Sequence, residues 1–152
     1  MNERINDKIE QISKFLDELS EIKPDNFEEY ETNIEKKAAC ERYCEKIIEC
    51  VVDIAFLVFK ERIVEKDKNV RIPEDDSEVF EILADKNIIS KEMAKKLIEA
   101  KAMRNYLAHR YGEIDDKKIY SAVSEELNND INKFLDFIEK AMKGSADKAN
   151  GN

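Results

Sequence analysis

Apolar side chains recur at steps of three and four along most of the chain, and this spacing constrains the fold more than any other feature. An early stretch carries the repeat in Ile5, Ile9, Ile12, Leu16 and Leu19. A late stretch carries it in Tyr120, Val123, Leu127, Ile131, Phe134 and Ile138. This is the period of an amphipathic α-helix with one face turned to a core. No segment requires a β-strand, and the three glycines and two prolines argue against a β-sandwich.

Breaks between the periodic stretches divide the chain into helices. Pro24 ends the first, the stretch 67–73 reads as a loop, and Ser90 and Asp115 or Asp116 are suitable N-caps. We predict an all-α fold, an antiparallel bundle of about five helices near 5–19, 26–62, 76–86, 91–112 and 116–143. One helical domain would cover 1–143, with Gly144 as the C-terminal cap and 144–152 as a disordered tail.

The later half of the second predicted helix, from Ile47 to Phe59, is apolar on most faces, so we expect this helix to lie at the centre. Asp53 interrupts it, and we predict a buried acid with a partner. The three cysteines, Cys40, Cys44 and Cys50, are expected to be reduced and buried. We predict no metal site, because a zinc ion needs about four ligands and the single histidine is distant in sequence.

Composition excludes several classes of protein. The longest apolar run, Ile54–Phe59, has six residues, which is too short to span a membrane. The first residues lack the apolar core of a signal peptide, so we expect a cytoplasmic protein. A net charge of −9 disfavours a protein that coats nucleic acid non-specifically, although a local basic site remains compatible with it.

The stretch 101–112 reverses the sign of the overall charge. It holds three basic side chains and one histidine, with no acid, and would attract an anionic ligand. Arg104 falls on the stripe of apolar residues that should pack against the core, where a guanidinium is costly unless it is paired or functional. Asn105 and His109 are four residues apart and share a helix face, so the amide could orient the imidazole.

Arg104 and His109 are five residues apart, which separates them by roughly 140° around a continuous helix. They can converge only if the helix loosens before Gly112 or if a second subunit completes the site. Local chemistry alone also leaves structural roles open. The histidine could donate to the end of the helix, and the arginine could stack on a tyrosine.

The run from Arg104 to Tyr111 resembles the R-x4-H-x-Y signature of the HEPN superfamily, specifically the HepT-like toxins, and the similarity covers about 1–143. The resemblance implies a metal-independent ribonuclease toxin without a cofactor, acting as a homodimer whose two motifs line one cleft. It implies an MNT-type nucleotidyltransferase antitoxin that attaches adenylate to the motif tyrosine. Arg104 and His109 would be catalytic, Asn105 supporting, and Tyr111 the modification target.

The chemistry of the motif is consistent with this resemblance. RNA is cleaved without metal when its 2′-hydroxyl attacks the adjacent phosphate, a reaction that needs a base, an acid and a cation. Histidine suits proton transfer near neutral pH, and arginine matches phosphate oxygens. Lys101 and Arg110 are candidate contacts to RNA. The alternatives are a non-catalytic helical module that binds a nucleotidyltransferase or RNA, and a protein whose main biochemical event is modification of Tyr111.

Overall fold

The computed structural model describes residues 2–109 and 115–150, and within these ranges every regular element is helical. This confirms the predicted all-α class. The α-helices are α1 (Glu3–Ile22), α2 (Phe27–Thr32), α3 (Ile34–Phe59), α4 (Asp76–Asp85), α5 (Lys91–His109), α6 (Asp116–Ser121) and α7 (Leu127–Asn150). Single π-helical turns, η1 (Lys60–Val64) and η2 (Ala122–Glu126), extend α3 and join α6 to α7.

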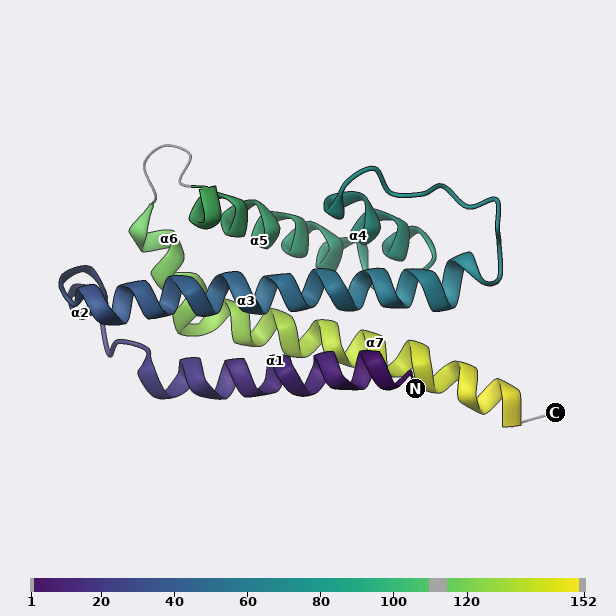
Figure 1. Cartoon of the computed structure of the whole chain (residues 1–152), viewed down its shortest axis with the longest axis horizontal. Helices are drawn as coiled ribbons and strands as arrows, with labels where there is room; N and C mark the ends of the chain where they lie inside the picture. The colour runs from purple at the N-terminus through teal and green to yellow at the C-terminus, as the bar shows by residue number, and fades with distance from the viewer. Residues whose placement is uncertain (1, 110–114, 151–152) are drawn as a thin grey trace.

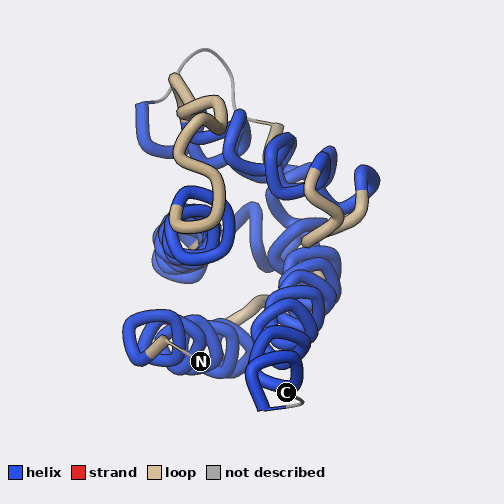
Figure 2. Tube along the Cα trace, turned by 90° about the vertical axis from the view of Figure 1, so that its right-hand side faces the viewer, coloured by secondary structure: helices blue, strands red, loops and turns tan. Residues whose placement is uncertain are grey.

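The four long helices α1, α3, α5 and α7 run alternately up and down the bundle (Figure 1). Seen from the end, they surround a shared interior (Figure 2). The C-terminal end of α5 lies at the same end of the bundle as α2 and α6 (Figure 1). The bundle therefore places the arginine–histidine motif at one end of the molecule.

Helix α3 is the central element, as predicted, and packs against α1, α2, α4 and α5. The structure divides the second predicted helix at Asn33, which ends α2 and caps α3. Its side-chain oxygen accepts a hydrogen bond from the backbone N–H of Lys36 at 3.0 Å. Asparagine competes well for such local bonds, which is why it interrupts a helix that apolar spacing alone would continue.

Two of the predicted caps are confirmed. Ser90 Oγ accepts from the N–H of Met93 at 3.0 Å and so caps α5. Asp115 accepts from the N–H groups of Lys117 and Lys118 at 3.1 and 3.3 Å and so caps α6. The predicted end of the fourth helix near Gly112 lies outside the described residues.

Two expectations are wrong. Gly144 does not cap the last helix, because α7 continues through it to Asn150. A glycine inside a helix costs only about 1 kcal/mol relative to alanine, so helix-forming neighbours can carry the helix past it. Asp53 has the expected partner but is not buried: its side chain is 51 % exposed and pairs with Lys8 at 3.0 Å.

The three cysteines are buried and free, as expected. Burial raises the pKa of the Cys44 thiol to about 12 and that of Cys40 to about 11. The described residues contain no group of three or more histidine, cysteine or acidic side chains placed to hold a metal ion. Among the helices of the same ranges, none has both the length and the apolar character to cross a membrane.

Candidate functional site

The candidate site lies at the C-terminal end of α5, which packs against α3, α4 and α7. Met93, Leu97 and Leu107 are buried on one side of α5 and fix its rotation against the core. Arg104 lies between Leu97 and Leu107 on that buried side, at the position the apolar repeat indicated. The packing of α5 therefore turns the guanidinium of Arg104 towards α3.

Arg104 is held by an acid on the central helix. Its Nη2 donates to Oε1 of Glu49 at 2.7 Å, and its Nη1 donates to the side-chain oxygen of Asn105 at 3.2 Å. The side chains of Arg104 and Glu49 are 27 % and 43 % exposed. The Nε of Arg104 is buried and has no hydrogen-bond partner in the described part of the chain. The charge on the packing seam is thus paired, and one donor of the guanidinium is left unused.

His109 is the last residue of α5 and is exposed. Because α5 is α-helical from Lys91 to His109, Arg104 and His109 diverge by roughly 140° around its axis. The helix is regular between the two residues. Within the described range, Arg104 and His109 of one chain therefore do not converge through a loosened helix. Asn105 lies beside Arg104 as one of its acceptors, a contact that the sequence did not indicate.

Lys101, a predicted contact to RNA, is turned towards α4. Its Nζ lies 3.8 Å from Oδ2 of Asp76 and 3.5 Å from Oγ of Ser77, and its side chain is 13 % exposed. These contacts give Lys101 a structural role between α5 and α4. Arg110 and Tyr111, the other predicted contact and the predicted modification target, lie outside the described residues.

Helix α6 lies at the same end of the bundle as the C-terminal end of α5 (Figure 1). Lys37 Nζ lies 2.7 Å from Oδ2 of Asp116, which joins α3 to α6. The ring of Tyr120 lies 5.8 Å from that of Phe27 and 5.6 Å from that of Tyr30, centre to centre. These contacts anchor α6 to α2 and α3.

Sequence analysis missed Glu49, the acid that pairs with Arg104. The available signal was an acidic residue within the apolar stretch of the central helix. Two acids fit that description, and the sequence analysis considered only Asp53. The structure shows that Glu49 is the acid that faces Arg104. Tyr106 precedes His109 by three residues, on the same face of α5, and is 50 % exposed. A single exposed aromatic side chain is common on protein surfaces, so its exposure alone assigns Tyr106 no role.

Solved structures of HEPN toxins share the antiparallel helical bundle of this chain. One is a tri-AMPylated HEPN toxin of Shewanella oneidensis in complex with an MNT antitoxin. It superposes with a TM-score of 0.82 at 21 % identity and covers 92 % of this chain and 99 % of that one. A toxin–antitoxin structure with AMP-PNP gives 0.80 at 20 % identity and covers 91 % and 99 %.

The chain belongs to the ribonuclease HepT-like family, whose model matches residues 5–141. A tRNA nuclease HepT from Aphanizomenon flos-aquae is 26 % identical over 142 residues, which cover 90 % of this chain and 92 % of that protein. A protein of Archaeoglobus fulgidus named as a candidate RNase is 30 % identical over 135 residues, covering 89 % and 92 %. The resemblance read from the motif is confirmed at the level of the family.

Proposed function

We propose that this chain is a metal-independent endoribonuclease toxin of a toxin–antitoxin pair, acting in the cytoplasm. Arg104 and His109 are the proposed catalytic residues, and Asn105 supports Arg104. The observation that carries the proposal is the arginine fixed by Glu49 on the helix that ends in an exposed histidine, in a member of a ribonuclease family. A tRNA nuclease among its relatives makes tRNA the first substrate to test.

The proposed reaction begins when the 2′-hydroxyl of the RNA attacks the adjacent phosphorus and the bond to the 5′-oxygen of the next nucleotide breaks. Histidine accepts the proton of the 2′-hydroxyl, and a second histidine returns a proton to the leaving oxygen. A guanidinium has five N–H donors, of which Arg104 gives two to the side chains of Glu49 and Asn105. The remaining donors suit the extra negative charge that develops on the phosphate oxygens.

A homodimer supplies what one chain lacks. Each chain has a single histidine, and α5 separates it from Arg104 by roughly 140°. A two-fold axis beside the ends of two α5 helices would bring both copies of each residue to one cleft. One histidine then serves as the base and the other as the acid.

The decisive test is cleavage of purified tRNA in the presence of EDTA. We expect the wild type to cut, leaving a 2′,3′-cyclic phosphate and a 5′-hydroxyl. His109→Ala and Arg104→Ala should each lose about 100-fold or more of the rate. Arg42→Ala is the matched control, because Arg42 pairs with Glu45 on α3 and is 61 % exposed. A variant of either motif residue that cuts as fast as the control would exclude the mechanism.

The proposed partner is an MNT-type nucleotidyltransferase that inactivates the toxin by adding adenylate to Tyr111. The solved complex of an AMPylated HEPN toxin with an MNT antitoxin supports this partner. Adenylate attached two residues beyond His109 would add phosphate charge beside Arg104 and occupy the cleft.

The modification is tested by incubating the protein with ATP and the nucleotidyltransferase encoded beside it, followed by intact-mass measurement. Tyr111→Phe should abolish the mass gain, whereas Tyr106→Phe, which changes an exposed tyrosine on α5, should retain it. Mass gain on Tyr111→Phe would place the modification elsewhere. Partner binding without cleavage by the free wild type would favour the non-catalytic alternative.

A further inference from the structure

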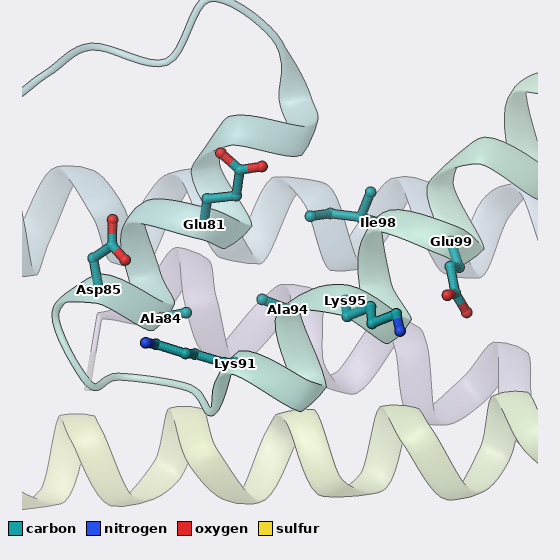
Figure 3. A pocket seen from close by; sticks show the side chains of 8 residues that line it. All are labelled: Glu81, Ala84, Asp85, Lys91, Ala94, Lys95, Ile98 and Glu99. Atoms are coloured by element: carbon teal, nitrogen blue, oxygen red, sulfur yellow. The ribbon is translucent and has the colours of Figure 1, made fainter.

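Among the described residues, two hollows that lie away from the motif differ in the charge of their lining. One, of about 430 Å³, lies between α4 and α5 (Figure 3). Its rim mixes the acids Glu81, Asp85 and Glu99 with Lys91 and Lys95, so it has no strong preference for either sign of charge.

The other hollow, of about 460 Å³, is basic. It is formed where η1 and the residues after it, the turn after α4 and the later part of α7 meet, and four cations line it: Arg62, Lys66, Lys86 and Lys140. Asp67 is the one acid among its described lining residues. We call this site the basic hollow. Its net positive lining contrasts with a chain of net charge −9.

The cations of the basic hollow are not neutralised by carboxylates. Lys66, Lys86 and Lys140 form no ion pair within the described ranges, whereas Lys8, Lys36, Lys37, Lys96 and Lys101 each lie within 4 Å of an acid. Arg62 donates through Nη2 to the backbone oxygen of Met142 at 3.0 Å, and its Nε lies 3.3 Å from the sulfur of the same residue. The guanidinium is thus held in position by neutral groups and keeps its full charge.

The basic hollow lies well away from the motif. Arg62 follows Glu49 by thirteen residues along α3 and η1, a rise of about 20 Å. At the motif itself, Arg104 and Lys101 are engaged by Glu49 and Asp76, so little free positive charge remains there among the described side chains. A long polyanion could contact the motif and the basic hollow together, but a dinucleotide could not.

We propose that the basic hollow binds phosphate groups of the RNA strand that is cut at the motif, an inference that rests on the proposed function. Lysine binds phosphate as a point charge, and the fixed guanidinium of Arg62 adds directed N–H donors. Phosphate contacts of this kind position a strand without reading its sequence. An RNA-binding site of this kind is compatible with an acidic chain, because the positive charge is local. Its affinity for RNA should fall as the salt concentration rises.

The test uses His109→Ala as a background that does not cut, with binding of a labelled single-stranded RNA of about 20 nucleotides followed by fluorescence anisotropy. Lys86→Gln with Lys140→Gln removes two charges from the basic hollow. Lys95→Gln with Lys133→Gln is the matched control, since both lysines are exposed, helical, outside the hollow and without an ion pair in the described ranges. We expect about tenfold weaker binding for the first pair and a salt slope lower by about 1.5 to 2. The control pair should bind as the background does.

The outcomes separate this inference from the proposed function. Equal affinity and salt slope for the two double variants would overturn the RNA site at the basic hollow, even if the wild type cuts RNA. Weaker binding by the first pair, together with a wild type that never cuts, would retain the site and overturn the proposed catalysis. Absence of RNA binding in every variant would overturn both.

Discussion

Glu49 links the central helix α3 to the candidate site, because its Oε1 lies 2.7 Å from Nη2 of Arg104 and fixes the guanidinium. Glu49→Ala should let that side chain move and lower the rate of RNA cleavage by about tenfold or more, since a displaced donor stabilises the transition state poorly. Glu49→Gln keeps an oxygen that accepts from Arg104 and should fall between this variant and the wild type. The pair is partly exposed, so the free energy of unfolding should change by less than about 1 kcal/mol.

Single-turnover cleavage and urea unfolding measure these two effects separately. Glu45→Ala is the control, since Glu45 pairs with Arg42 at 3.1 Å on the same helix. If Glu49→Ala cuts at the rate of Glu45→Ala, Glu49 does not position Arg104. A loss of rate matched by a comparable loss of stability would point to damage of the fold instead.

The buried thiols give a second prediction at the scale of single residues. Burial raises the pKa of Cys44 to about 12 and that of Cys40 to about 11, so the native state holds these protons more tightly than the unfolded chain. The stabilisation is fully present below the ordinary thiol pKa of about 8.5 and is lost as pH rises towards the native values. Iodoacetamide at mildly alkaline pH should label the thiols of the unfolded chain much faster than those of the native protein. Equal rates, followed by mass spectrometry, would contradict their burial.

Within α7, Gly144 distinguishes a continuous helix from a capped one. A Cβ added at Gly144 has no atom within 4 Å, so Gly144→Ala should stabilise the helix by about 0.5 to 1 kcal/mol through its higher propensity. A left-handed cap would be destabilised by the same change. Circular dichroism and thermal unfolding check the sign, and a lower melting temperature would restore the cap that the sequence suggested. Lys143→Ala, an exposed change on the same turn, controls for a general effect of alanine.

At the level of helices, apolar spacing predicted the long elements, because each buries a stripe that has the helical period. It failed at two positions where a single residue decides whether a helix ends. Asn33 divides the second predicted helix by capping α3, and Gly144 does not end α7. Whether an isolated asparagine or glycine breaks a helix depends on small local energies that spacing does not record.

The sequence predicted part of the candidate site but not its tertiary contacts. Spacing placed Arg104 on the packing seam and showed that it needed a partner, but the partner is 55 residues away on α3 and depends on how two helices face each other. Lys101 is a second example, because the stretch 101–112 holds no acid, whereas the packing of α4 places Asp76 3.8 Å from its Nζ. Sequence local to a motif therefore shows which charges are present, and the tertiary packing decides which of them are free.

At the scale of the whole molecule, the proposed catalysis requires a dimer, because Arg104 and His109 diverge around α5. If both histidines of a pair serve one cleft, a dimer with one His109→Ala chain lacks either its acid or its base. Mixed dimers prepared by refolding equal amounts of wild type and variant should then retain about a quarter of the wild-type activity, because only dimers of two intact chains cut. Independent sites would retain about half.

Cleavage measured over a series of mixing ratios separates a squared dependence on the wild-type fraction from a linear one. Arg42→Ala in place of His109→Ala is the control, which should leave activity unchanged. A linear dependence, or a protein that sediments as a monomer while cutting RNA, would remove the shared cleft and require each chain to assemble its own acid and base.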